Sequence, residues 1–205
     1  MPGPEIMPSI ELLSVLLLAA LPLMGSPGPA TMSLAATGAA YGVRRGVPYY
    51  VGIVFGTTAV LVMVASGLTG LILAVPGVEP VILAVGCIYI LYLAYRIATA
   101  PTMAKAAGHG QAPTLYGGLL LALANPKAYA AIGAVFSSVV ISDQVWLDGA
   151  AKVVTLTAVI VVVNLIWLTL GATLAGAFRA PRIGRAINVG FAVLLVASVA
   201  LAVLA

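Results

Sequence analysis

Charged side chains are scarce in this sequence: they make up 7% of its 205 residues, whereas hydrophobic residues make up 63%. A soluble domain carries about 25% charged residues, so water cannot be the main solvent around this chain. Cysteine and histidine occur once each, which argues against an intramolecular disulfide and against a metal centre built from these residues. The composition predicts an integral membrane protein without a metal or another cofactor.

Long uncharged stretches separate the few charges. A membrane-spanning helix needs about 20 apolar residues, and six such helices fit if Lys127 lies inside the fourth. Transmembrane β-strands are about 10 residues long and alternate in polarity, which these stretches do not. We therefore expect one all-α membrane domain over residues 1–205. The stretches are residues 12–43, 46–78, 80–95, 106–126, 153–178 and 186–205.

The basic residues gather in the loops after spans one, three and five. Lys and Arg concentrate in cytoplasmic loops, which predicts that both termini lie outside. Because these positive charges flank the membrane, they do not indicate a nucleic-acid partner. The N-terminus lacks the basic segment of a signal peptide, so we interpret residues 12–43 as a mature helix. The basic loops hold Arg44, Arg45, Arg96, Lys105, Arg179, Arg182 and Arg185, and the opposite loops hold Glu79, Asp143, Asp148 and Lys152.

The first span contains two prolines around a glycine, in LPLMGSPGPA. A proline inside a helix removes one N–H and displaces the carbonyl four residues earlier. For Pro27 and Pro29, the displaced carbonyls belong to Leu23 and Gly25. Gly28 between them relaxes the steric restraint on the backbone. We expect an interruption here, and irregular backbone at membrane depth must be buried in protein or line a cavity.

The fourth span contains the triplet Asn125-Pro126-Lys127 near its middle, and Pro126 should displace the carbonyl of Ala122. A lysine at mid-membrane costs about 2.5–3.5 kcal/mol. In one interpretation, Lys127 snorkels or caps displaced carbonyls and serves only the structure. In the other, it faces a central cavity between the two breaks and binds an anionic group of a substrate.

The two breaks lie 99 residues apart, and at the same offset residues 58–64 (TAVLVMV) match residues 157–163 (TAVIVVV). Two sets of three spans must be inverted relative to each other, because three is odd. Paired interrupted helices in an inverted repeat are typical of secondary transporters. The pattern predicts six helices as a 3+3 inverted repeat, residues 1–100 and 101–205, with helices one and four interrupted.

Glycines recur at intervals of four residues, a spacing that allows helices to approach closely. We expect these glycines to pack helices within the monomer, with a homodimer as the alternative. They are Gly38, Gly42 and Gly46, followed by Gly52 and Gly56.

Several motifs resemble the lysine/homoserine/threonine exporter family (the LysE/RhtB type): SPGPATMSLAATGAAYGVRRG, GCIYILYLAYR, GGLLLALANPKA and RIGRAINVGFAVLL. Members of this family are bacterial inner-membrane exporters of amino acids or related metabolites, generally driven by an ion gradient. The resemblance implies the same function and location here. Many relatives carry an acidic residue early in span two, where this chain reads GTTAV, so a lysine-like substrate is not implied.

The chemistry of an amino acid fits these motifs. Lys127, with the N–H groups at the half-helix starts after Pro29 and Pro126, can bind the carboxylate. Asn125 and displaced carbonyls can receive the ammonium. No Asp or Glu lies deep in any span, which favours a neutral or zwitterionic substrate and leaves the proton-coupling group unidentified. The candidate substrate-binding residues are Pro27, Gly28, Pro29, Asn125, Pro126, Lys127 and Asn164.

Asn164 is the only strongly polar side chain in the middle of span five. Burying its amide without a partner costs about 1–3 kcal/mol. It either forms an interhelical hydrogen bond with no role in transport, or it lines the cavity beside the span-four break.

Other classes of protein fit less well. An enzyme would need paired intramembrane aspartates or a histidine-based metal cluster, and a Ser26–Lys127 dyad has no supporting residues, so we expect no catalysis. A channel usually has a ring of polar residues, and these helices carry few. A channel or a membrane scaffold without substrate coupling is the alternative to a transporter.

Overall fold

The computed structural model describes residues 10–67 and 112–174 continuously, with runs of one to three residues between 75 and 99 and between 185 and 197. Within these residues the labelled elements are all α-helices, as expected. The predicted third and sixth spans lie largely outside the described residues, and so does Cys87. The helices are α1 (Ile10–Gly25), α2 (Pro29–Ala65), α6 (Leu115–Leu123), α7 (Pro126–Ser138) and α8 (Val145–Leu174).

The predicted interruption of the first span is confirmed. Helix α1 ends at Gly25 and α2 begins at Pro29, which occupies the first helical turn, where no N–H is needed. The expectation that Gly28 is needed to relax a steric restraint on the backbone is wrong, however. Its backbone is extended, with φ −171° and ψ 179°, a conformation that any residue adopts.

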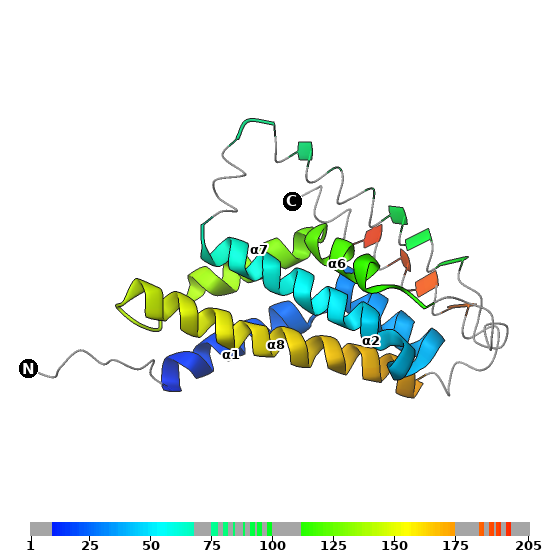
Figure 1. Ribbon diagram of the computed structural model, residues 1–205, viewed down its shortest axis with the longest axis horizontal. Coiled ribbons are helices and arrows are strands. Elements are labelled where there is room, and N and C mark those ends of the chain that lie inside the picture. The colour runs from blue at the N-terminus through cyan, green and yellow to red at the C-terminus, as the bar shows by residue number, and fades with distance from the viewer. Residues whose placement is uncertain are drawn as a thin grey trace, which may run out of the picture.

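Gly42 divides α2 into two helical segments. Its φ of 75° and ψ of 168° are non-helical and fall in a region that glycine alone adopts readily. In Figure 1 the chain runs to the right before this residue and returns to the left after it. The expected packing of Gly42 against another helix is not seen among the described residues, because a Cβ there would meet none of their atoms within 4 Å. Gly42 is the corner between the predicted first and second spans.

The fourth span is also broken where it was predicted to be. Helices α6 and α7 meet at a bend of 60°, with Ala124 and Asn125 between them and Pro126 as the first residue of α7. As at the first break, proline begins the second half-helix. The chain therefore contains two interrupted helices among its described residues.

Helix α8 begins at Val145, earlier than the predicted start at residue 153. Asp148 and Lys152 were expected in a loop, but both lie in the first turns of this helix. Their side chains form an ion pair of 2.7 Å, so each charge is compensated inside the helix. An acidic residue also interacts favourably with a helix N-terminus, which explains why these charges did not end the helix.

The remaining glycines of the spacing pattern pack helices within the monomer, as expected. A Cβ at any of them would approach a neighbouring helix to within 3 Å. At Gly38, Gly52 and Gly56 these neighbours include backbone atoms, so only glycine allows the approach, whereas at Gly46 the neighbour is the end of a flexible leucine side chain. The nearest atoms are Leu168 O at 2.0 Å for Gly38, Leu168 Cδ1 at 2.7 Å for Gly46, Leu115 O at 2.0 Å for Gly52 and Ala122 Cβ at 2.6 Å for Gly56.

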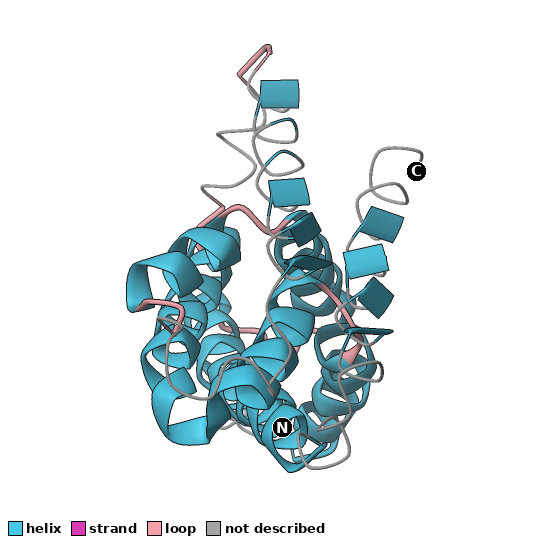
Figure 2. Ribbon diagram, turned by 90° about the vertical axis from the view of Figure 1, so that its right-hand side faces the viewer, coloured by secondary structure: helices cyan, strands magenta, loops and turns pink. Residues whose placement is uncertain are grey.

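The described helices run side by side along the long axis of the molecule (Figures 1 and 2). Two apolar clusters hold them together. The first cluster joins α1, α2, α7 and α8 towards the end where α7 ends and α8 begins; its buried residues are Leu16, Ala20, Val60, Leu61, Ala128, Ile132, Val135, Ile141, Leu156, Val159, Ile160 and Val163. The second cluster joins α2, α6 and α8 and contains Ala30, Leu34, Tyr49, Ile53, Leu121 and Leu168.

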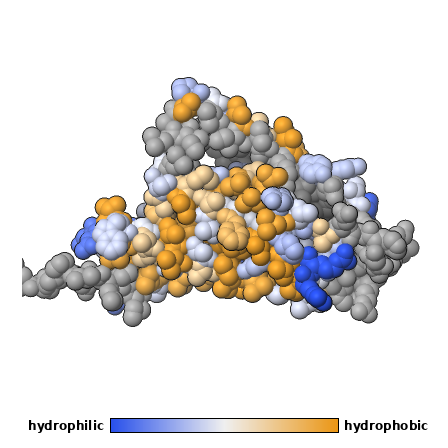
Figure 3. Space-filling view, viewed as in Figure 1, coloured by the Kyte–Doolittle hydropathy of each residue, from blue (hydrophilic) through white to orange (hydrophobic). Residues whose placement is uncertain are grey.

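The outer surface is apolar as well. Large side chains such as Leu18, Phe55 and Val154 are exposed by 72%, 65% and 71%. Figure 3 shows apolar side chains over the middle of the described surface and the most hydrophilic ones at its ends. Helix α8 is long and apolar enough to cross a membrane, as is α2 when its two segments are counted as one helix, and the bent pair of α6 and α7 would make a third span. This surface suits lipid as the solvent.

Candidate functional site

The two breaks lie against each other, and Lys127 joins them. Its Nζ atom donates a hydrogen bond of 2.5 Å to the carbonyl of Ser26 and one of 3.2 Å to the carbonyl of Pro27. An ammonium group has three N–H donors, so these two bonds leave one donor for a ligand.

Gly28 makes room for this lysine. A Cβ at Gly28 would lie 2.5 Å from Cδ and 3.0 Å from Nζ of Lys127, closer than atoms of these kinds can approach. A larger residue here would therefore force the lysine side chain that crosses Gly28 to shift. The sequence pointed to both residues separately but did not indicate that they touch.

The carbonyls displaced by the three prolines all have partners. The carbonyl of Leu23 accepts from Ser26 Oγ at 3.0 Å, and that of Gly25 accepts from the indole Nε1 of Trp167 at 3.0 Å. The carbonyl of Ala122 accepts from the Asn125 N–H at 3.3 Å. These carbonyls are less available to a substrate ammonium than the sequence suggested.

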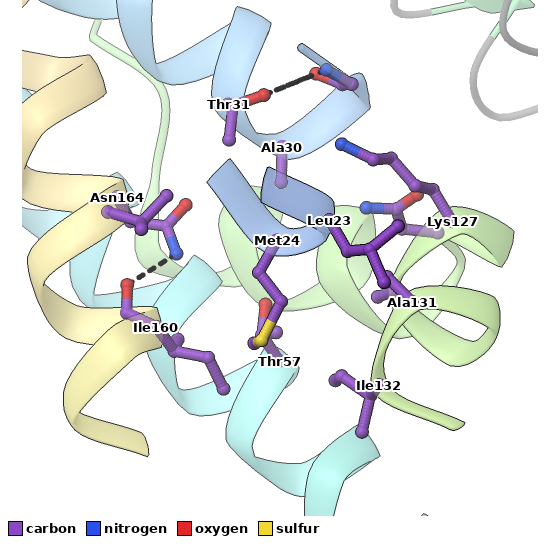
Figure 4. Close-up of a pocket in the computed structure, with 14 residues that line it drawn as sticks. Leu23, Met24, Ala30, Thr31, Thr57, Lys127, Ala131, Ile132, Ile160 and Asn164 are labelled. Carbon is purple, nitrogen blue, oxygen red and sulfur yellow. Dashed lines mark hydrogen bonds between the residues drawn. The ribbon is translucent and has the colours of Figure 1, made fainter. Parts of the chain in front are cut away.

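A small cavity of about 50 Å³ lies between the breaks (Figure 4). Such a volume holds roughly four water molecules, which is too little for an amino acid unless the helices move. Its polar lining comprises Gly28, Thr31, Thr57, Asn125, Lys127 and Asn164. Its apolar lining comprises Leu23, Met24, Ala30, Ala128, Ala131, Ile132, Ile160 and Val163.

Two buried amide oxygens in this lining have no hydrogen-bond partner among the described residues: Oδ1 of Asn125 and Oδ1 of Asn164. The two residues are only 4% and 5% exposed. Asn164 uses its Nδ2 to donate to the carbonyl of Ile160 on its own helix, at 2.7 Å (Figure 4). Of the two interpretations of Asn164, the interhelical hydrogen bond is not seen among the described residues, because this bond lies within α8, and Asn164 lines the cavity. A buried acceptor without a partner is costly, and a ligand that donates hydrogen bonds would remove the cost.

The electrostatics of the cavity favour an anionic group near Lys127, because among the described lining residues only Lys127 is charged. Helices α2 and α7 both begin beside the cavity, and the N-terminus of a helix carries partial positive charge. One side of the cavity therefore suits a carboxylate, and the two amide oxygens suit an ammonium group.

The structure sorts the predicted site residues into two groups. Gly28, Asn125, Lys127 and Asn164 line the cavity. Pro27, Pro29 and Pro126 do not line it; they end or begin the half-helices, and Pro27 also offers its carbonyl to Lys127.

Thr31, Thr57 and Trp167 were not predicted. Thr31 Oγ1 accepts a hydrogen bond of 2.9 Å from the Gly28 N–H, which caps the start of α2 (Figure 4). Its place three residues after Gly28 could have indicated this cap. Nothing in the local sequence marks Thr57 or Trp167, because their roles depend on which helices are neighbours.

A cavity with polar groups between two interrupted apolar helices is typical of one class of protein, the membrane transporter. The chain matches the LysE type translocator family over residues 21–205. It belongs to this family, which is a family of translocators and not a class of enzymes.

A curated relative is the leucine efflux protein of Enterobacter sp. (strain 638). It is 30% identical over 107 residues, which are 50% of this chain and 51% of that protein. The chain thus matches the relative over about half the length of each. No solved structure matches this chain.

Proposed function

We propose that this protein is a secondary transporter that exports a small neutral amino acid, or a related zwitterionic metabolite, from the cytoplasm. The observation that carries this proposal is the cavity that combines one cation with two unpaired amide oxygens. The ammonium of Lys127 and the two helix N-termini bind the carboxylate of the substrate. Oδ1 of Asn125 and Oδ1 of Asn164 accept hydrogen bonds from its ammonium.

The rest of the cavity lining favours an uncharged side chain. Met24, Ile132 and Ile160 offer only apolar contact, and no described lining residue carries a negative charge to balance a cationic side chain. The leucine efflux protein that matches part of the chain supports leucine as the first substrate to test.

We further propose the six-helix 3+3 inverted repeat for the complete fold. Two observations on positions 99 residues apart support it. Gly28 and Lys127 touch, and the matched segments place Val60 and Leu61 in the same buried cluster as Val159 and Ile160. Residues related by a pseudo-two-fold axis meet where they lie close to that axis.

The transport test uses purified protein in proteoliposomes with an imposed pH gradient. We expect saturable transport of leucine or another neutral amino acid that increases with the gradient, and none of lysine or glutamate. An open channel would give flux that does not saturate, and a scaffold would give none. Apolar clusters lie on both sides of the cavity, which favours alternating access over an open channel.

Asn164→Leu separates substrate binding from structure. Removing an unsatisfied buried amide oxygen relieves a cost of about 1–3 kcal/mol, so the variant should be at least as thermally stable as the wild type. Because an acceptor for the ammonium is lost, we expect its apparent affinity for the substrate to fall by about tenfold or more. Transport kinetics and a thermal unfolding curve measure the two effects. Unchanged affinity would remove Asn164 from the site.

The orientation is also a proposal: both termini outside, and the basic loops in the cytoplasm of a bacterial cell. It predicts that an impermeant thiol reagent added outside labels Asp143→Cys but not Arg44→Cys, each in a Cys87→Ser background. Both positions are exposed in the structure. The Asp148 side chain is only 15% exposed, so it would be a poor probe. The reverse labelling pattern would invert the topology.

A further inference from the structure

A second charged cluster lies away from the cavity, at the end of the molecule where α7 ends and α8 begins. Lys152 Nζ pairs with Asp148 Oδ2 at 2.7 Å, and the two side chains are only 4% and 15% exposed. Within the described residues this is the one ion pair. Neither residue lines the cavity, so the proposed substrate site leaves both unexplained.

The pair connects helix α8 to the end of α7 and to the segment that follows it. Lys152 Nζ lies 4.9 Å from the centre of the Phe136 ring, within the range of a cation–π contact. Oδ1 of Asp148 accepts a hydrogen bond of 2.7 Å from the Ile141 N–H. The two charged side chains of α8 thus contact two separate parts of the protein, one at the end of α7 and one in the segment that follows it.

Both residues that the pair contacts are part of, or pack against, the first apolar cluster. Ile141 is a buried member of it, and Phe136 packs against it. The cluster also contains Ile132, Ile160 and Val163, which line the cavity. It therefore fills the space between the cavity and this end of the molecule, and α7 must separate from α8 for a substrate to leave in that direction.

We propose that the Asp148–Lys152 pair is a latch that holds this exit closed. The latch acts on the site through α7, because α7 carries Lys127 at its start and Phe136 near its end, and the facing helix α8 carries Asn164. Asp148 and Lys152 are positioning residues for transport. This proposal concerns which face of the cavity opens and does not depend on the identity of the substrate.

Breaking the latch leaves an uncompensated charge in a buried place. Removing one partner of a buried ion pair is strongly unfavourable, whereas replacing both by apolar or neutral groups is tolerated. Asp148→Asn keeps an oxygen that can accept from the Ile141 N–H but leaves Lys152 unpaired, which favours any state in which Lys152 reaches water. That state is one with α7 and α8 apart.

The test is the accessibility of a cysteine in the cavity, measured on purified protein in detergent. Ala131→Cys, in a Cys87→Ser background, reports on the cavity because Ala131 lines it. Leu121→Cys is the matched reference, since Leu121 is 0% exposed and belongs to the second cluster. We expect Asp148→Asn to raise the labelling rate at position 131 about tenfold or more and to leave position 121 unchanged.

Two further variants complete the test. Asp143→Asn removes the same charge from an exposed position nearby and should change neither rate. Adding Lys152→Met to Asp148→Asn removes the unpaired charge but keeps a flexible apolar side chain against Phe136, so labelling at position 131 should return towards the wild-type rate. Unchanged labelling of position 131 in Asp148→Asn, or an equal rise at both positions, would overturn the latch. Because these measurements use no substrate, their result tests the latch independently of the proposed transport activity.

Discussion

Replacing Lys127 by methionine should abolish substrate-dependent transport and leave insertion into the membrane intact. Methionine preserves the length of the side chain over Gly28 and removes the charge. A hydrogen bond to a charged group contributes about 1.5–3 kcal/mol, and the bonds of Lys127 are only partly buried, so we expect a loss of roughly tenfold or more in transport efficiency. The measurement is flux in proteoliposomes that contain equal amounts of wild-type and variant protein.

Charge and position can be separated at this site. In Gly28→Ala, the new Cβ would lie 2.5 Å from Cδ of Lys127, so the charge remains but the lysine side chain must shift from its position beside the carbonyls of Ser26 and Pro27. If Lys127 must sit between the breaks to bind a carboxylate, both variants lose transport. A Lys127→Met protein that inserts well and transports with unchanged affinity would show that the lysine serves only the structure.

The hydrogen bonds of Lys127 fit both interpretations of this residue. The carbonyls of Ser26 and Pro27 compensate part of the cost of a lysine at this depth, about 2.5–3.5 kcal/mol. These bonds also hold the ammonium beside the cavity. A purely structural cap would not require the unpaired oxygens of Asn125 and Asn164 in the same lining, and this is why we favour the binding role.

The sequence predicted the features that have local causes. Proline cannot continue a helix without losing a hydrogen bond, so the breaks at Pro27 and Pro126 could be placed to within a residue or two. Four of the five spaced glycines also pack as expected. Gly52 and Gly56, one turn apart, both approach α6, whereas Gly38 and Gly46 lie on either side of the corner at Gly42 and both approach Leu168 of α8.

Features that depend on neighbouring helices could not be predicted in this way. The overlap between Gly28 and Lys127 joins residues that are far apart in the chain. Gly42 has the same spacing as the packing glycines, and only its positive φ reveals a corner. The start of α8 was missed because the charge of Lys152 is neutralised by Asp148, one turn earlier.

The approach of α2 and α8 should be as sensitive to substitution as the site itself. A Cβ at Gly171 would lie 1.9 Å from the carbonyl oxygen of Ala35, and a Cβ at Gly38 would lie 2.0 Å from that of Leu168. Backbone atoms on both sides leave no flexible group that could move away. The two helices must therefore separate to admit even a methyl group.

We expect Gly171→Ala to lower the stability of the purified protein by about 1–3 kcal/mol, the usual cost of overpacking, and Gly171→Leu to prevent folding. Gly133→Ala is the matched control, since Gly133 lies within α7 and a Cβ there would meet no atom of the described residues within 4 Å. Alanine is favoured over glycine in a helix by up to about 1 kcal/mol, so this variant should be as stable as the wild type or more stable. Thermal unfolding in detergent compares the wild type with Gly171→Ala and Gly133→Ala. If Gly171→Ala proved as stable as Gly133→Ala, the backbones of α2 and α8 could not be in contact. Helix α8, which carries Asn164, would then have to pack against the rest of the cavity in a different way.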